Sequence, residues 1–348
     1  MASGARAKTG RRAAKRAVKT MDEIARLAEV SKATVSRALQ GSPLIALETR
    51  ERIAAIASKH GYTVNRNARR LWAKRANTIA VVLHLPPSTG KAVSAPFIFQ
   101  LLADVSRALS IRHQDILLRS ADADDIESYQ RLIASKVADG LIFLGQGERG
   151  AWLDELARTT VPFVAWGAVD QAQRYCSVGS DNFKGGMLAG QRFAGLACKR
   201  ALFVGNRSHL ELELRRQGLE AGLRSDRGKV LICDLEIADF SFETAHDAMR
   251  ALLAKGREPP DAVFAASDTI AMAVIVALRE AGLRVPEDVA VIGYNDSPIA
   301  AHFNPPLSTV RQDTHQAGAL LVEKLFQILD GARPTSVKLP TDLIVRQS

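Results

Sequence analysis

The chain has 348 residues, of which 47% are hydrophobic and 24% charged, a composition ordinary for a soluble globular protein with room for two or three domains. The net charge of +10 is unevenly distributed, because residues 1–77 hold 18 Lys and Arg against 5 Asp and Glu, whereas the remainder holds 29 against 32. This asymmetry predicts a polyanion-binding N-terminal part attached to a nearly neutral body. No segment approaches about eighteen consecutive apolar residues, which argues against a membrane-spanning chain.

The Cys and His residues give no sign of a disulfide framework or a metal site. Cys176, Cys198 and Cys233 are too few and too scattered for either a set of disulfides or a CxxC metal motif. The seven His residues form no HxxxH or HExxH pair. We therefore predict reduced thiols in a cytoplasmic protein, with no metal and no cofactor.

Residues 1–19 are strongly basic, with seven Lys and Arg and no acidic side chain. We predict a basic disordered tail, and additional contacts to phosphates are the alternative. The segment lacks the apolar run of a secretory signal.

Residues 20–41 predict two short helices around a tight turn, an arrangement that presents side chains to the DNA major groove. Thr20 followed by Glu23 is a capping-box sequence for the first helix, and Ser31 is a suitable N-cap for the second. Helical spacing predicts that the following side chains face inward: Ile24, Leu27, Ala28, Val35, Ala38 and Leu39. The same spacing leaves the following side chains pointing outward: Lys32, Ala33, Ser36, Arg37 and Gln40.

At this point the chain resembles the LacI/GalR family of bacterial transcription regulators. The similarity rests on these residues, in the family's order and spacing: Val30-Ser31, Thr34-Val35-Ser36-Arg37, Leu39, Thr49-Arg50, Gly61-Tyr62, Asn65-Arg66, Ala68-Arg69 and Leu71. It implies a helix-turn-helix domain that binds double-stranded operator DNA, with Lys32 and Ala33 at the positions that discriminate bases. The DNA contacts that it implies are Ser31, Lys32, Ala33, Thr34, Ser36, Arg37, Gln40, Tyr62, Asn65, Arg66, Ala68 and Leu71.

Three positions depart from the family's usual pattern. Glu29 stands in the turn where the family usually has Gly, the residue most tolerant of positive φ. Ala46 stands where the third helix would normally have a Ser cap, a loss of roughly 1 kcal/mol. Val64 replaces the Pro that usually precedes the hinge. Together these departures predict a somewhat less rigid headpiece.

The segment 65–76 is short and basic, and it is too short to be stably helical alone in water. A flexible solvated linker is the reading that follows from the residues themselves. The resemblance implies that the segment becomes a hinge helix on operator DNA, pairs with its twin and enters the minor groove. Leu71 stands where the family inserts a leucine between base pairs. Folding coupled to binding would let a distant body control DNA affinity.

From residue 78 onward, apolar strands alternate with amphipathic helices, which predicts parallel sheets covered on both faces. The expected strands form two series: Ile79–Leu83, Ile116–Leu118, Gly140–Leu144 and Pro162–Ala165, then Ala201–Val204, Lys229–Cys233, Ala262–Ala265 and Val289–Gly293. The expected helices are Phe99–Ser110, Ser128–Ser135, Leu214–Gly222, Phe242–Ala254 and Ile270–Ala281. Two series of similar length predict two lobes with a ligand cleft at the carboxyl ends of the strands.

The body again resembles the LacI/GalR family, whose body is similar to a periplasmic sugar-binding protein. The similarity includes Asp139-Gly140, Asp181-Asn182, Gly185-Gly186, Arg215 with Gly218, Ser267-Asp268, and Gly293-Tyr294-Asn295-Asp296. It implies that Arg215 binds the effector, since its fork of donors suits hydroxyl pairs or a carboxylate. The full set of expected effector contacts is Phe97, Trp166, Arg215, Ser267 and Asn295. For each of them a structural role is the competing interpretation, as a salt bridge for Arg215, a turn for Asn295 and core for Trp166.

The sequence gives weaker evidence for two other functions. Gly145–Gly150 matches GxGxxG after an apolar strand, so an NAD(P)-dependent enzyme is the rival hypothesis. However, such a fingerprint normally follows the first strand of its domain, and a glycine-rich strand-to-helix loop explains it equally. A secreted solute-binding protein would fit the body but lacks a signal peptide and leaves residues 20–75 unexplained. We find no catalytic arrangement and predict that the chain is not an enzyme.

The combined prediction is an all-α helix-turn-helix headpiece with a hinge helix, followed by an α/β two-lobed periplasmic-binding-protein-like body with two Rossmann-like parallel sheets. The expected divisions are a tail over 1–19, a DNA-binding domain over 20–64, a hinge over 65–76, and an effector-binding and dimerisation domain over 77–348. We expect a repressor, acting as a homodimer or homotetramer on a pseudo-palindromic operator and controlled by a sugar or sugar acid. A regulator corepressed by a nucleobase or nucleoside stays as the alternative, because only the family's habit favours induction.

Overall fold

The computed structural model describes residues 20–39, 42–60, 62, 75–84, 96–120, 126–147, 151–224, 230–256 and 258–348. The chain divides into two units, Met1–Lys74 and Arg75–Ser348, called here the headpiece and the body. The expected tail over 1–19 and hinge residues 65–74 lie outside the described residues. In the described part of the chain, no helix is both long and apolar enough to cross a membrane.

The headpiece folds into the helices α1 (Met21–Ala28), α2 (Lys32–Leu39) and α3 (Leu47–Lys59). The predicted capping box is confirmed, since Thr20 Oγ1 accepts from Glu23 N–H at 3.3 Å and Thr20 N–H donates to Glu23 Oε2 at 3.2 Å. Ser31 Oγ likewise accepts from Thr34 N–H at 3.1 Å at the start of α2. Local hydrogen bonds therefore set where both helices of the pair begin.

The turn and the third helix show the consequences of the departures noted in the sequence. Glu29 adopts the left-handed conformation at φ 53°, which a Gly would adopt at lower cost. Ala46 precedes α3 and makes no capping hydrogen bond with its side chain.

A small apolar core joins the three helices. Its members are Ile24, Ala25, Ala28, Val35, Ala38, Ile53 and Ala57. The expectation that Leu27 faces inward is wrong, because this side chain is 48% exposed. Helices α2 and α3 contact the side of α1 that carries Ile24, Ala25 and Ala28, so Ala25 rather than Leu27 completes the buried stripe.

The first lobe of the body, the N-lobe, is built on a sheet in the order β11-β5-β4-β3-β1-β2, with every pair parallel. Its strands are β1 (Thr78–Leu83), β2 (Asp115–Ser120), β3 (Gly140–Leu144), β4 (Phe163–Trp166), β5 (Ser177–Ser180) and β11 (Val337–Leu339). Its helices are α5 (Pro96–Ile111), α6 (Ile126–Ala134), α7 (Ala151–Leu156) and α12 (Thr314–Leu329). Alternate residues of β1 enter two different cores, one beneath α5 and α12 and the other beneath α6 and α7.

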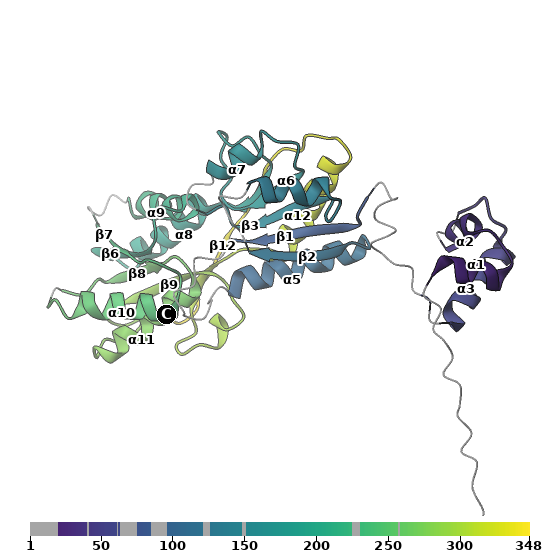
Figure 1. Ribbon diagram of the computed structural model, residues 1–348. Coiled ribbons are helices and arrows are strands. Elements are labelled where there is room, and N and C mark those ends of the chain that lie inside the picture. The colour runs from purple at the N-terminus through teal and green to yellow at the C-terminus, as the bar shows by residue number, and fades with distance from the viewer. Residues whose placement is uncertain are drawn as a thin grey trace, which may run out of the picture. The chain divides into compact units, whose positions relative to one another are not determined.

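The second lobe, the C-lobe, repeats this plan with its sheet in the order β12-β10-β9-β8-β6-β7. Its strands are β6 (Arg200–Gly205), β7 (Leu231–Glu236), β8 (Ala262–Ala265), β9 (Ala290–Asn295), β10 (Ser308–Arg311) and β12 (Asp342–Ile344). Its helices are α8 (Asn182–Gly195), α9 (Leu210–Leu223), α10 (Phe242–Leu253), α11 (Asp268–Glu280) and the 3-10 turn η1 (Ala300–His302). Helices α8 and α9 cover one face of the sheet and α10 and α11 the other (Figure 1). Only the pairing of β10 with β12 is antiparallel among the described strands.

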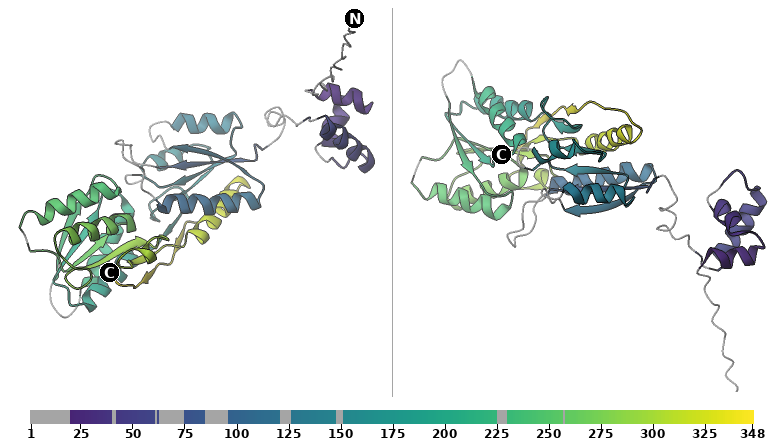
Figure 2. Two further views of the ribbon diagram at one scale, coloured as in Figure 1. Left: turned by 90° about the horizontal axis from the view of Figure 1, so that it is seen from below. Right: turned by 45° about the horizontal axis from the view of Figure 1, so that its top comes forward.

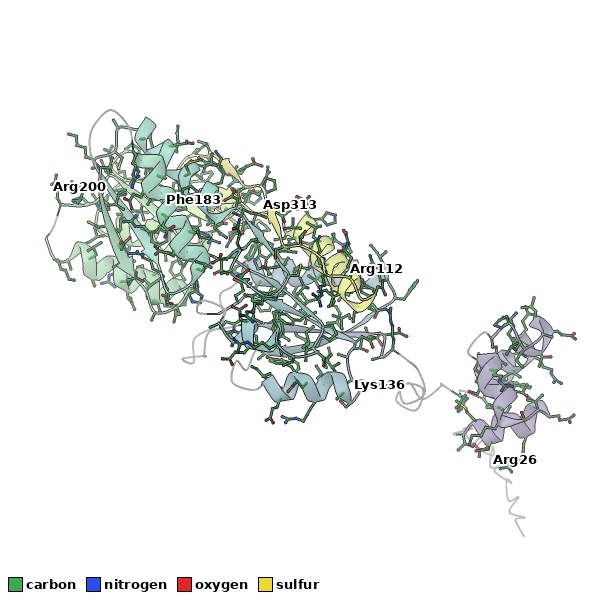
Figure 3. The ribbon with its side chains drawn as sticks, turned by 90° about the horizontal axis from the view of Figure 1, so that it is seen from above. Arg26, Arg112, Lys136, Phe183, Arg200 and Asp313 are labelled. Carbon is green, nitrogen blue, oxygen red and sulfur yellow. The ribbon has the colours of Figure 1, made fainter. Side chains whose placement is uncertain are left out.

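The described chain passes between the lobes at three places, from β5 to α8, from β10 to α12 and from β11 to β12 (Figure 2). Figure 3 marks two of these crossings, with Phe183 at the start of α8 and Asp313 just before α12. Asp181 ties the first crossing to the third, because its N–H donates to Leu339 O at 2.8 Å and its carbonyl accepts from Thr341 Oγ1 at 3.3 Å. The predicted two-lobed α/β fold is confirmed.

Candidate functional site

The outward surface of α2 carries the side chains that the sequence assigned to DNA. Lys32, Ala33 and Arg37 are exposed, while Thr34 and Ser36 are half-buried. Ser31 and Thr34 also hydrogen-bond to each other through their hydroxyls at 2.8 Å, so both take part in capping α2. These five side chains of α2 differ in size and charge, and together they form a surface suited to the major groove.

Tyr62 follows α3 and packs against the headpiece core, where its N–H donates to Ala57 O at 2.9 Å. The remaining residues assigned to DNA lie outside the described residues: Gln40, Asn65, Arg66, Ala68 and Leu71. Their roles stay predictions.

In the body, the strand order of each lobe reverses at its first strand, between β1 and β3 in the N-lobe and between β6 and β8 in the C-lobe. Ligands of open α/β sheets bind beyond the carboxyl ends of the strands at such reversal points. The residues assigned to the effector lie at or near these ends in two groups. Phe97 and Trp166 belong to the N-lobe, and Arg215, Ser267 and Asn295 belong to the C-lobe.

Arg215, on α9, is buried with 7% of its surface exposed. Its Nε–H donates to Asn182 Oδ1 at 2.8 Å and its Nη1–H donates to the carbonyl of Ala266 at 2.7 Å. The guanidinium also lies 3.6 Å from the centre of the Tyr294 ring. Burial lowers the pKa of Arg215, yet a guanidinium remains charged in proteins. The sequence identified Arg215 but not Asn182 and Tyr294 as its supports.

Arg215 is positioned by an unusually close approach of α8 and α9. A Cβ at Gly186 would lie 2.0 Å from Arg215 O, and one at Gly218 would lie 2.0 Å from Phe183 O. Any side chain at these positions would separate the two helices. Glycine therefore lets Arg215 on α9 reach Asn182 at the start of α8.

Ser267 and Asn295 each have an internal partner. Ser267 Oγ caps α11 by accepting from Ile270 N–H at 3.3 Å. Asn295 Oδ1 accepts from Gln312 Nε2 at 2.7 Å, and its backbone has a φ of 116°, a conformation that is strained for a residue with a side chain. Gln312 lies in the crossing from β10 to α12, so this bond joins the C-lobe group to an inter-lobe connection.

Asp268 begins α11 directly beneath this group and is 2% exposed. Thr309 Oγ1 donates to its Oδ1 at 2.5 Å, and Ser297 N–H donates to its Oδ2 at 2.6 Å. Burial raises the pKa of Asp268 from 3.8 to about 6, with the two hydrogen bonds opposing that rise. The carboxyl holds the segment after β9 and strand β10 together within the C-lobe.

In the N-lobe, the rings of Phe97 and Trp166 lie 5.7 Å apart. Trp166 is 6% exposed and belongs to the core beneath α5 and α12, whereas Phe97 is half-buried at the first turn of α5. The structure therefore gives Trp166 a core role and leaves Phe97 the more accessible ring of the pair.

Two further features of these strand ends were not singled out from the sequence. Gln146, after β3, exchanges two hydrogen bonds with the backbone of Ala168, both at 2.9 Å. In the C-lobe, the rings of His209 and Phe240 lie 5.5 Å apart, between the end of β6 and the start of α10. Gln146 lies two residues after an expected strand and inside the glycine-rich motif, whereas no pattern in the sequence pointed to His209 or Phe240.

The glycine loop behind the rival enzyme hypothesis has a structural explanation. Gly145 and Gly147 adopt positive φ values of 109° and 66°. A Cβ at Gly147 would lie 2.7 Å from the ring of His84, which follows β1. Residues 148–150 lie outside the described residues. Among the described residues there is also no cluster of His, Cys, Asp and Glu that could hold a metal ion.

Comparison with known proteins gives two family matches. Residues 20–65 match the bacterial regulatory proteins of the lacI family, and residues 191–348 match a periplasmic binding protein-like domain. The chain is 33% identical over 342 residues to the HTH-type transcriptional regulator CelR of Thermobifida fusca, covering 94% of this chain and 98% of that one. It is 29% identical to the ribose operon repressor of Haemophilus influenzae, covering 88% and 91%.

Solved structures agree with these matches over nearly the whole chain. The Lac repressor dimer bound to operator and the anti-inducer ONPF is similar with a TM-score of 0.82 and 25% identity, covering 94% of this chain and 98% of that one. The complex of the transcriptional regulator CelR with cellobiose is similar with a TM-score of 0.66 and 32% identity, covering 94% and 99%.

Proposed function

The chain belongs to the lacI family of bacterial regulatory proteins, and we propose that it is a repressor whose operator affinity is controlled by a sugar or sugar acid bound to its body. It is a DNA-binding transcriptional regulator. In our proposal it acts in the cytoplasm as a homodimer or homotetramer on a pseudo-palindromic operator, because two-fold symmetry of the protein is mirrored in its DNA site.

Arg215 is the observation that carries the effector assignment. Its direct contacts are to neutral groups, namely the Asn182 amide, the Ala266 carbonyl and the Tyr294 ring. The carboxylates of Glu211 and Asp268 act on its charge without forming an ion pair among the described residues. A buried cation without an ion-pair partner is costly, and a ligand carboxylate or a pair of hydroxyls would offset that cost. Arg215 therefore favours a polar ligand rich in acceptors.

The rings near the strand ends favour a sugar within that class. Phe97 in the N-lobe and Phe240 in the C-lobe are half-buried, so each retains some exposed surface. An aromatic ring beside hydrogen-bonding groups suits a sugar, whose C–H surface packs on the ring while its hydroxyls bind polar groups. The sugars in the names of the similar proteins, cellobiose and ribose, are consistent with this ligand class.

Helix α12 offers a route from the effector group to the hinge. At its start, Gln312 bonds Asn295, and Asp313 caps the helix by accepting from Gln316 N–H at 2.8 Å. At its other end, Asp330 pairs with Arg75 at 2.8 Å, where the chain enters the body. In our proposal an effector that alters the Asn295–Gln312 bond shifts α12, and with it Arg75 near the end of the hinge.

A thermal-shift screen of the full-length protein tests the effector proposal. The panel contains sugars, sugar acids, nucleosides and phosphorylated metabolites, since a ligand of the native state raises its melting temperature. We expect a sugar or sugar acid to give the largest shift and Arg215→Lys to abolish it. Arg224→Ala, on the exposed end of the same helix, is the control and should respond like the wild type. A full response of Arg215→Lys, or a response to nucleosides alone, would overturn the assignment.

A further inference from the structure

An acidic side chain lies in contact with the lysine that the DNA-binding proposal assigns to base discrimination. Asp22 is the second residue of α1, and Lys32 is the first residue of α2. Lys32 Nζ lies 2.8 Å from Asp22 Oδ2, with the two side chains 61% and 54% exposed. Before DNA is bound, the ammonium group of Lys32 therefore already has an anionic partner.

Tyr62 belongs to the same cluster. Partial burial raises the pKa of its hydroxyl, the positive charge of Lys32 lowers it and the negative charge of Asp22 raises it, so both charges lie near the ring. Asp22, Lys32 and Tyr62 come from three separate segments, and two of them belong to the proposed DNA contacts. Asp22 is thus an acid within a surface expected to face phosphates.

The two helix ends explain why this pair forms. The first turn of a helix exposes N–H groups and the positive end of its dipole, which disfavours a cation there and favours an anion. Lys32 at the first position of α2 is in the unfavourable place, and Asp22 in the first turn of α1 is in the favourable one. Pairing with Asp22 offsets the unfavourable position of Lys32.

Other headpiece acids do not share this arrangement. Glu23 is committed to the capping box with Thr20. Glu48 and Glu51 are exposed on α3, and Glu29 lies in the turn. Among the described residues, Asp22 is the acid that forms an ion pair with a member of the proposed DNA-contact set.

We propose that Asp22 is a specificity-determining residue that lowers the affinity of the headpiece for DNA of arbitrary sequence. The inference rests on the proposed function of α2 as the helix that reads DNA. Binding to arbitrary DNA depends on neutralising phosphates, and a lysine held by a carboxylate contributes less to it. At a matching site the ammonium group can bind guanine O6 and N7 in the major groove, and this additional contact offsets the loss of Asp22, whereas DNA of arbitrary sequence does not supply it. Specificity then arises partly from an element that disfavours the wrong partner.

The test compares Asp22→Asn with the wild-type full-length protein on two DNA probes. One is a duplex enriched from a randomised pool by the wild-type chain, and the other is an unselected duplex of the same length. Affinities are measured over a series of KCl concentrations. We expect Asp22→Asn to bind the unselected duplex about fivefold more tightly, with the slope of log K against log[salt] steeper by about 0.9 for each headpiece bound. Affinity for the enriched duplex should rise less, so the specificity ratio falls.

Two further variants separate this role from simpler explanations. Glu51→Gln makes the same change of charge on α3, away from Lys32, and should preserve the specificity ratio. Asp22→Glu keeps a carboxylate within reach of Lys32 and should also preserve it. If Asp22→Asn raises the affinity for both duplexes by the same factor, Asp22 affects DNA binding only through its charge, and the inference is overturned. Failure of the wild-type chain to enrich any sequence would instead overturn the DNA-reading proposal itself.

Discussion

The two lobes of the body share a strand order but differ in the chemistry at their strand ends. In both, the first strand lies second from one edge of the sheet and the order reverses beside it. The N-lobe presents aromatic rings there, with Trp166 packed into the core and Phe97 against it. The C-lobe instead buries the charged or ionisable side chains of Arg215 and Asp268. One topology thus supports an apolar surface in one lobe and a polar, hydrogen-bonded one in the other.

This difference extends to how the helices pack. Helices α8 and α9 of the C-lobe touch backbone to backbone through Gly186 and Gly218. Helices α5 and α12 of the N-lobe approach less closely, since a Cβ at Gly318 would lie 2.8 Å from the backbone of Asp104, and elsewhere they pack through apolar side chains such as Leu101 and Leu321. Close-packed backbones fix the position of Arg215, whereas side-chain packing tolerates adjustment. We therefore expect substitutions in the C-lobe to have the larger effects.

The largest effect is expected from Gly218→Val in the C-lobe. Its Cβ would lie 2.0 Å from Phe183 O, so α8 and α9 must separate, at a cost of roughly 4 kcal/mol or more in the free energy of unfolding. Urea denaturation measures this change. Gly195→Ala, on α8 with no atom within 4 Å of the added methyl, is the control and should be neutral or slightly stabilising. Equal stability of Gly218→Val and the wild type would remove the distinction between the lobes.

The second-largest effect is expected in the pH dependence of stability, through the buried carboxyl of Asp268. Because its pKa is about 6 in the folded protein and 3.8 ordinarily, the folded state binds this proton more tightly than the unfolded chain. The stabilisation is fully present below pH 3.8 and is lost as pH rises through 6, a change of roughly 3 kcal/mol. The contribution of Asp268 is measured by comparing the unfolding free energies of the wild type and Asp268→Asn across pH 4 to 7. The difference between the two proteins should narrow toward pH 7, and a difference independent of pH would contradict the assignment.

A smaller effect is expected in the N-lobe from Phe97→Ala. Loss of this half-buried ring should weaken binding of the effector found by the thermal-shift screen by about tenfold, corresponding to roughly 1.4 kcal/mol. Calorimetric titration gives the affinity. Phe99→Ala removes a 47% exposed ring from the same helix and should leave the affinity unchanged. If both substitutions have the same effect on the affinity, the proposal that the Phe97 ring contacts the effector is wrong.

The smallest effect is expected from Asp330→Asn, which breaks the ion pair with Arg75. Both side chains are at least half exposed, so the pair is worth less than about 1 kcal/mol. We expect the effector-induced change in operator affinity to fall by about twofold while the effector affinity itself stays constant. Glu323→Gln makes the same charge change on α12 and is the control. An unaltered effector response in Asp330→Asn would remove this end of α12 from the proposed route.

The sequence predicted the headpiece well because its determinants are local. Thr20, Glu23 and Ser31 act on residues within one helical turn, and such contacts can be read from spacing alone. Leu27 was misplaced because the direction from which α2 and α3 pack is not encoded in the periodicity of α1. The central strands of the body were predicted because they are continuous apolar runs.

The elements that join the lobes were not predicted. Strands β5, β11 and β12 are only three or four residues long, and their partners lie far away in the sequence, as in the pairing of Val337 with Val178. The residues that hold Arg215 in place were not predicted for the same reason. Asn182 and Tyr294 lie 33 and 79 positions from it, and only the fold brings them together. Ser267 shows the opposite case, since it was predicted as an effector contact although its cap to Ile270 spans only three residues.

The central claim is that a small molecule bound to the body controls the binding of the headpiece to DNA. The most direct test is an equilibrium titration of the full-length protein with the enriched duplex, at fixed salt, across a range of concentrations of the sugar that raises the melting temperature most. We expect operator affinity to change by about 5- to 150-fold in the wild type and to stay constant in Arg215→Lys. An operator affinity that does not change while the sugar saturates the wild-type protein would contradict the claim.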